Sequence, residues 1–239
     1  MKNKEKRFRY FGYNTYRLIT SGIVFVCVIV INFAKPDLYF NLPVWAYVLF
    51  TLYYSIFPIK DMIRQANKTR YKGKQFAENY IPVSSLDENE FLQMKKKYDK
   101  GAVRSMIFWL CFMAVVGALY LCKIIGREWI IFFFAMSDFC VYFAIFFWCP
   151  FHKILLKPHC CMDCRIFNWD SFFSFSFLIF IPSIYTYILF ALGVISLVIW
   201  EINYKKEPKR FYKISNACLN CENCDMEHCK GKKEILSAK

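Results

Sequence analysis

The chain has 239 residues, of which 57% are hydrophobic, and its formal net charge is +14 at pH 7. This apolar share is above that of ordinary soluble domains. Because the apolar residues form long blocks with Lys and Arg between them, the composition excludes a sizeable soluble domain, and we expect no nucleic-acid partner.

Five apolar blocks approach or exceed the roughly 20 residues that a helix needs to cross a lipid bilayer. In chain order, the blocks cover residues 17–34, 43–59, 105–122, 129–148 and 172–200. They predict an all-α, polytopic helical membrane protein with about five hydrophobic helices in residues 1–204, followed by a Cys-rich tail in residues 205–239. No small-x-small cleavage site follows the first block, so this block is predicted to be an uncleaved span.

Lys and Arg are distributed unevenly among the segments that connect the blocks. Residues 1–17, 60–104 and 149–170 together contain 20 of them, against three in the two short segments after the first and third blocks. Since positively charged loops tend to remain on the cytoplasmic side, the N-terminus, the long loop and the Cys-rich loop of residues 149–170 are predicted to be cytoplasmic.

The fifth block leaves two topologies open. Its length of about 29 residues favours one crossing, because two crossings need about 40 residues. One crossing would place the basic, Cys-rich tail outside the cell, whereas a turn at Pro182-Ser183 would return it to the cytoplasm. We favour the return because of the charge and thiols of the tail, although a broken segment needs protein around its backbone.

The long loop contains the sequence "SSLDENEFLQMKKKY". Ser85 and Glu88 have the spacing of a capping box, which predicts an amphipathic helix from about Leu86 that continues into the third span. An alternative role for this helix is to bind anionic lipid headgroups.

The tail contains the sequence "ACLNCENCDMEHCKGKK". Its cysteines have the spacing C-x2-C-x2-C-x4-C, and they are Cys218, Cys221, Cys224 and Cys229. Disulfides between such close neighbours would be strained, so these cysteines indicate a metal site. Over about a dozen residues the segment resembles bacterial ferredoxin-type 4Fe–4S proteins, whose pattern is C-x2-C-x2-C-x3-C-P. Here the last spacing is four, and Lys230 stands in place of the proline.

A second group of cysteines follows the fourth block. It comprises Cys149, Cys160, Cys161 and Cys164. The segment "WCPFHKILL" is similar to the Cys-Pro-Phe segment after a span in membrane-bound ferredoxin-like electron carriers, with His152 in place of the usual glycine. Eight cysteines match two four-cysteine sites, and a 4Fe–4S cluster and zinc both remain open as the cofactor.

The metal interpretation has further consequences. We expect the two cysteine groups to lie close together and the tail, which has few apolar residues, to depend on the metal for folding. The alternative is that all eight are unliganded thiols in a reducing cytosol. The four other cysteines lie in or next to the blocks and are expected to be small buried hydrophobic residues: Cys27, Cys111, Cys122 and Cys140.

Asp138 lies near the middle of the fourth block, where a carboxyl group is costly and is a functional candidate. It could be a buried acid that ties helices together, with a hydrogen bond from Tyr142. It could instead accept protons beside a quinone or an ion path, which would make it catalytic. After the second cysteine group, we expect Trp169 in the headgroup layer and Asp170 at the cap of the fifth helix. Arg165 is expected to contact a lipid phosphate or an acid.

Together these patterns predict an integral membrane protein with cytoplasmic, cysteine-ligated metal sites. The most specific function is electron transfer through 4Fe–4S clusters at the membrane face, to or from a redox protein or a quinone. Structural zinc sites in a non-enzymatic membrane protein are one alternative, and a metal sensor or transporter is another. Neither a Gly-rich phosphate loop nor a nucleophile–base motif occurs in the sequence, so enzymatic activity stays open.

Overall fold

The computed structural model describes residues 2–63, 75–158 and 164–220, and within these ranges the regular secondary structure is helical. The longer helices are α1 (Lys2–Ala34), α2 (Val44–Met62), α3 (Glu88–Leu121), α4 (Arg127–Phe146), α5 (Asp170–Phe175) and α6 (Ile184–Lys206). The short ones are η1 (Pro36–Phe40), η3 (Ala77–Asn79), η4 (Phe151–Leu156), η6 (Phe167–Trp169), η7 (Ser176–Phe180), η8 (Pro208–Phe211) and η9 (Ala217–Leu219). The predicted all-α fold is confirmed.

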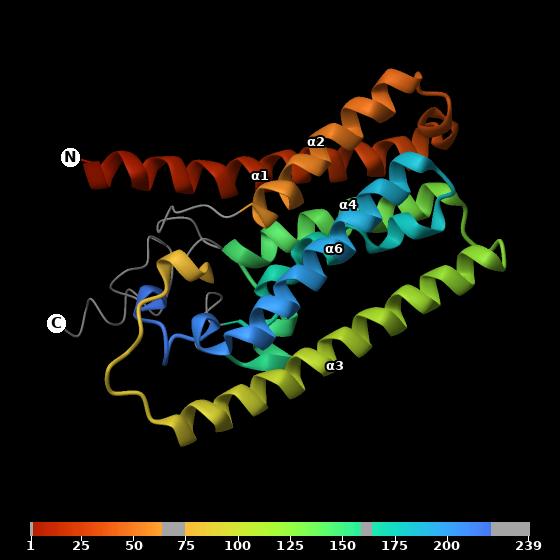
Figure 1. Ribbon diagram of the computed structural model, residues 1–239. Coiled ribbons are helices and arrows are strands. Elements are labelled where there is room, and N and C mark those ends of the chain that lie inside the picture. Colours follow the sequence, from red (N-terminus) through yellow and green to blue (C-terminus); the bar gives the residue numbers. More distant parts are fainter. Residues whose placement is uncertain (1, 64–74, 159–163, 221–239) are drawn as a thin grey trace.

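The long helices form an elongated bundle (Figure 1). Helix α1 packs along α4, α2 packs along α6, and α3 lies at the periphery. Four segments of the described chain are long and apolar enough to cross a membrane, namely Thr15–Ala34, Glu88–Leu121, Arg127–Phe146 and Ile184–Lys206. The apolar part of α2, Val44–Lys60, is shorter. These lengths are compatible with an integral membrane protein.

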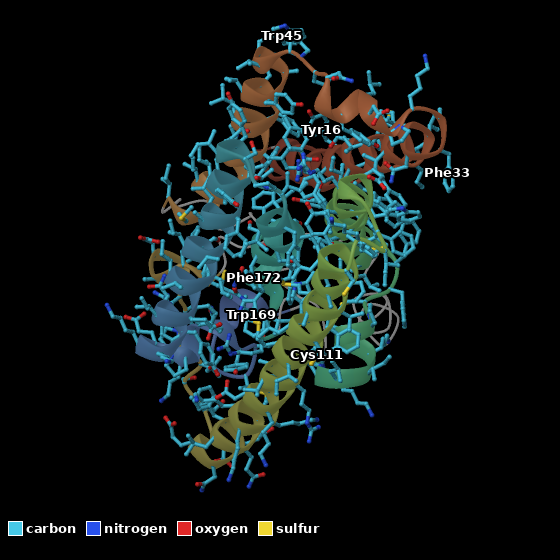
Figure 2. All side chains as sticks on the ribbon, turned by 90° about the vertical axis from the view of Figure 1, so that its right-hand side faces the viewer. Tyr16, Phe33, Trp45, Cys111, Trp169 and Phe172 are labelled. Carbon is cyan, nitrogen blue, oxygen red and sulfur yellow. The ribbon has the colours of Figure 1, made fainter. Side chains whose placement is uncertain are left out.

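The outer surface of the bundle carries many large apolar side chains, while aromatic residues also fill its interior. Figure 2 shows Phe33 and Trp45 at the periphery, in agreement with their exposed fractions of 81% and 65%. Phe172 and Trp169 lie between the helices and are buried. Such an outward-facing apolar surface suits a lipid environment, because lipid chains are as apolar as the side chains they meet.

The fifth apolar block is a hairpin of two segments. The first segment comprises α5 and η7, and after a turn at residues 181–183 helix α6 runs back. At one end of the hairpin, Trp169 Nε1 donates to Glu201 Oε1 at 2.7 Å. At the other end, Thr186 Oγ1 donates to the Ile181 carbonyl at 2.7 Å. The chain therefore reverses at Pro182-Ser183, and the end of α6 returns to the end of the bundle where the 149–170 loop lies.

Protein surrounds the first segment of this hairpin. Its residues are largely buried, and it packs against α6 and α4. Gly193 permits the close approach of α6, because a Cβ atom there would lie 3.0 Å from the Ser171 carbonyl oxygen. Trp109 on α3 donates its indole N–H to Ser176 Oγ at 3.0 Å. Ser176 thus has a partner inside the bundle, and protein surrounds the irregular backbone of the segment, as a membrane requires.

Helix α3 is continuous from the polar loop into the third apolar block, as the sequence predicted. Its N-cap is Asp87, whose Oδ1 accepts from the Asn89 and Glu90 amides at 2.8 and 3.3 Å. The predicted start near Leu86 is therefore close, but the predicted capping box of Ser85 and Glu88 is wrong, because Asp87 takes the capping position.

We call the end of the bundle formed by residues 75–100, 149–169 and 201–220, as far as they are described, the polar end. Here an aromatic cluster joins α3, α6 and the start of the tail, and its buried members are Phe91, Tyr98, Trp200, Tyr204, Phe211 and Tyr212. The tail also pairs with the long loop, since the Ala217 amide donates to the Ile81 carbonyl at 2.8 Å. Residues 207–220 of the tail thus pack against α3, α6 and the long loop, and the dependence of the tail on a metal stays a prediction.

Candidate functional site

Three of the eight candidate metal ligands lie in the described chain, and all three are at the polar end. They are Cys149, Cys164 and Cys218. The other five lie outside the described residues and are Cys160, Cys161, Cys221, Cys224 and Cys229. Among the described residues, no three His, Cys, Asp or Glu side chains come together as a metal-binding group. The predicted sites thus stay predictions.

Cys164 and Cys218 are both buried, at the points where the chain leaves the described ranges. The backbone carbonyl of Cys164 accepts from the Phe167 amide at 3.1 Å, which begins the turn into η6. The amide of Cys218 donates to Asn216 Oδ1 at 3.0 Å, so Asn216 caps η9. Cys149 lies between α4 and η4, where burial raises the pKa of its thiol.

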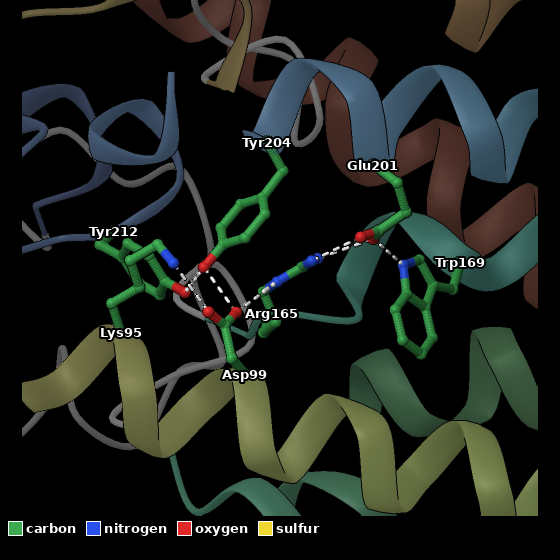
Figure 3. Close-up of polar contacts among 7 residues, drawn as sticks. All are labelled: Lys95, Asp99, Arg165, Trp169, Glu201, Tyr204 and Tyr212. Atoms are coloured by element: carbon green, nitrogen blue, oxygen red, sulfur yellow. Dashed lines mark hydrogen bonds and ion pairs between the residues drawn. The ribbon is translucent and has the colours of Figure 1, made fainter. Parts of the chain in front are cut away.

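Arg165, next to Cys164, is the centre of a partly buried ionic network (Figure 3). Its two terminal nitrogens donate to both carboxylate oxygens of Glu201 on α6, at 2.8 and 2.6 Å. Its Nε donates to Asp99 Oδ1 on α3 at 3.3 Å. A guanidinium group presents two parallel N–H bonds in this way to a carboxylate, so the contact fixes position as well as charge. The network joins the Cys-rich loop to two long helices.

Tyrosines extend the network into the tail. The Arg165 guanidinium stacks over the ring of Tyr204, with its Cζ atom 3.4 Å from the ring centroid. The Tyr204 hydroxyl donates to Asp99 Oδ1 at 2.7 Å. Because the single Tyr204 proton is used in that bond, Tyr212 is the donor in the 2.5 Å contact between the two hydroxyls. Lys95 completes the group with a 2.8 Å bond to Asp99 Oδ2.

These contacts and burial shift the pKa values of two residues of the network. Burial alone would lower the pKa of Arg165, but its bonds to Glu201 outweigh burial and hold that pKa above its ordinary value. Burial raises the pKa of Tyr212, and its neighbour Tyr204 adds to the effect. At neutral pH the network therefore contains a charged Arg165 and a neutral Tyr212.

The described contacts form a continuous connection between the two cysteine groups. It runs from Arg165 through Tyr204 to Tyr212, whose carbonyl accepts from the Asn216 amide at 2.9 Å. Asn216 in turn holds the amide of Cys218. The side chains at both ends of this connection are buried, so the starting points of the two groups are held on one frame at the polar end.

The sequence predicted the role of one residue of this network correctly, but it misplaced others or missed them. Arg165 does pair with acids, as one of its two predicted roles required. Trp169 was expected in the headgroup layer, but it is buried beside Glu201. Asp170 was expected to cap the fifth helix, but it is the first residue of α5, whose N-cap is Trp169. Asp99, Glu201 and Tyr204 were missed, because their partner is distant in sequence.

Asp138 lies inside the bundle, where it has an ionic partner that the sequence did not identify. Arg17 Nη2 on α1 is 3.3 Å from Asp138 Oδ1 on α4, and both residues are 2% exposed. Tyr54 on α2 donates to Asp138 Oδ2 at 3.4 Å, and Ser174 on α5 also hydrogen-bonds the carboxyl group. One carboxylate therefore connects four helices.

Aromatic rings surround the Arg17 guanidinium. Its Cζ atom lies 3.6 Å from the centroid of Phe57 and 4.6 Å from that of Tyr142. Tyr53 accepts from Nη1 at 3.2 Å. Cations are stabilised over aromatic faces, most strongly where water is absent. Arg17 was counted among the basic residues of the N-terminal segment, but it belongs to the interior of the bundle.

The four cysteines of the apolar helices are exposed on the outside of the protein, namely Cys27, Cys111, Cys122 and Cys140. Figure 2 shows Cys111 on α3. The expectation that they are buried is wrong, and a small thiol on this surface is compatible with contact to lipid.

No known protein family, no curated protein and no solved structure matches this chain.

Proposed function

We propose that this chain is an integral membrane protein whose polar end holds a cysteine-ligated metal centre. The observation that supports it best is the connection from Arg165 to Cys218, which holds the buried starting points of both cysteine groups on one frame. A metal site needs its ligands held in position by surrounding contacts, and the network of Figure 3 provides such a frame.

The donor set fits a soft metal centre. Four cysteines within twelve residues of the tail, together with those of the 149–170 loop, are the ligands that zinc and iron–sulfur clusters take. Cys164 and Cys218 would be ligands nearest the frame, and the cysteines outside the described ranges would complete the set. Bound in these sites, a 4Fe–4S cluster would carry electrons between a redox protein and the membrane, whereas zinc would tie the tail to the loop.

The hairpin of α5, η7 and α6 supports a single orientation for the polar end. It brings the five Lys and Arg of residues 205–213 to the polar end of the bundle. By the positive-inside rule this end is cytoplasmic, which is also the compartment where thiols stay reduced and available to metals.

The pair of Arg17 and Asp138 changes one part of the electron-transfer hypothesis. Arg17, Tyr54 and Ser174, from three other helices, all contact the Asp138 carboxyl group inside the bundle. We therefore assign Asp138 the role of connecting helices, and the proposed metal centre does not require it to move protons to a quinone.

The test is metal analysis of the full chain, purified in detergent without oxygen. Iron with sulfide and broad absorption near 400 nm would identify an iron–sulfur centre, and zinc in a colourless protein would identify the structural alternative. Cys164→Ser and Cys221→Ser should each lower the metal content at least by half. Cys111→Ser, which changes a cysteine on the outer surface, is the control and should leave the content unchanged. Wild-type protein without bound metal would refute the proposal.

A further inference from the structure

The outer side of α3 forms a shallow and largely open hollow, which we call the groove, where the helix leaves its apolar part. The groove has a volume of about 690 Å³. Its lining comes from the N-terminal half of this helix and comprises Leu92, Lys95, Lys96, Asp99, Lys100, Val103 and Arg104. Since α3 lies at the periphery of the bundle (Figure 1), this side faces the surroundings of the protein.

The groove is strongly basic. Lys96, Lys100 and Arg104 are exposed and lie four residues apart, so they form one row along the helix. Within the described chain, none of these three forms an ion pair. The only acid in the lining, Asp99, is already paired with Lys95 and Arg165. The row therefore presents three positive charges that no acid of the described chain neutralises.

This row continues directly into an apolar surface. Val103, Ile107 and Phe108 have exposed fractions of 56–59%. From Arg104 to the end of α3 there are 18 residues, about 27 Å at 1.5 Å per residue, which is close to the thickness of the hydrocarbon layer. Arg104 would thus lie at the edge of the hydrocarbon, and Lys100 and Lys96 at successive turns in the headgroup layer.

We propose that this groove binds the headgroup of an anionic phospholipid from the surrounding bilayer. The phosphate would contact Lys100 and Arg104, the acyl chains would lie along Val103, Ile107 and Phe108, and Lys96 would attract a second negative group. Lys and Arg at a helix end reach toward the headgroups while their methylene stems cover apolar surface. The combination of unneutralised cations with an adjoining apolar face favours a lipid over a soluble anion, and it does not depend on the metal centre.

The test is native mass spectrometry of the full chain released from mixed micelles that contain equal amounts of phosphatidylglycerol and phosphatidylcholine with identical acyl chains. We expect the wild type to retain phosphatidylglycerol preferentially. In the triple variant Lys96→Gln/Lys100→Gln/Arg104→Gln, the ratio of retained phosphatidylglycerol to phosphatidylcholine should fall about tenfold. The reason is that each basic residue near an anionic surface contributes to the attraction. A variant with Lys96→Arg and Lys100→Arg, which keeps the charge, should behave as the wild type.

Lys97, Lys205 and Lys206 are exposed but do not line the groove, so their triple change to Gln is the matched control. An equal loss in this control would show that net charge alone attracts the lipid and would overturn the proposal. An unchanged preference in the groove variant would do the same. Competition by soluble glycerol phosphate as strong as that by phosphatidylglycerol would identify a free phosphate as the ligand, and it would also overturn the lipid assignment.

Discussion

Arg17 on α1 and Asp138 on α4 are 121 residues apart in sequence, and their side chains meet at 3.3 Å inside the bundle. Each charge makes the other tolerable in an apolar interior, because a buried ion needs a partner and further hydrogen bonds. Tyr54 and the rings around Arg17 supply those additional contacts.

The pair reverses what the sequence alone indicates for Asp138→Asn. For an unpaired acid in a membrane, Asn would be neutral or stabilising. With Arg17 as its partner, Asp138→Asn should destabilise the fold by about 3–5 kcal/mol, since it leaves a buried guanidinium without its counter-charge. Arg17→Met/Asp138→Val, which removes both charges, should recover most of the loss in denaturant titrations in detergent. Wild-type stability of the Asn variant would show that Asp138 is uncharged in the folded protein.

Gly193 should be sensitive to substitution because α5 approaches α6 there. A Cβ atom would lie 3.0 Å from the Ser171 carbonyl oxygen, a backbone atom that moves only with the whole segment. Gly22 on α1 is a matched control, because its Cβ atom would make an ordinary 3.5 Å contact with Phe139. Both Ala variants gain the same helix propensity, so Gly193→Ala should be less stable than Gly22→Ala by about 1–3 kcal/mol. Equal stability would mean that the hairpin can open without loss.

Arg165→Lys tests the frame of the polar end. Lys keeps the charge but cannot bond both Glu201 and Asp99, because it lacks the planar fork. We expect the free energy of unfolding to fall by about 1–3 kcal/mol. This is less than for a fully buried ion pair, because the Asp99 and Glu201 side chains are 34% and 28% exposed. Hydrogen exchange should increase first in residues 207–220. Arg104→Lys, at an exposed position without an ion pair to any described residue, should change neither the stability nor the hydrogen exchange of residues 207–220.

Tyr212 should make stability depend on pH in the alkaline range. Because burial raises its pKa in the folded state, the neutral form is favoured there, while the unfolded chain ionises near pH 10. The contribution is fully present below about pH 10 and is lost as the pH rises, with a slope of up to about 1.4 kcal/mol per pH unit. Comparison of wild type and Tyr212→Phe between pH 9 and 11 should show a shallower decline in the variant. Parallel curves would argue that Tyr212 titrates normally.

The features that depend on local pattern were predictable. Apolar blocks located the long helices, because the length of a spanning helix follows from bilayer thickness. The fifth block was harder, since its length of about 29 residues suggested one crossing, whereas the charge and thiols of the tail favoured the return. The hairpin recruits Asp170 and Ser171 at its start and residues up to Lys206 at its end, and their polar side chains hid its full length.

The partners in the interior could not be predicted. Arg17 lies at the edge of an apolar block and looks like a loop cation, and only the packing of α1 on α4 brings it to Asp138. Glu201 and Asp99 likewise look like ordinary surface acids, because both lie in polar sequence outside the apolar blocks. Local sequence contains no information about which distant helix will face them, whereas the buried charge of Asp138 was visible because its own block is uniformly apolar.

The burial of α5 and η7 has a consequence for biosynthesis. Ser171, Ser174 and Ser176 are buried against other helices, so this segment would expose polar groups to lipid if it entered the membrane alone. Its insertion therefore has to await α6, with which it pairs, and the earlier helices that receive it. A ribosome-bound chain that ends near residue 183 should leave this segment outside the bilayer, and both helical segments of the hairpin should insert together once α6 has been synthesised.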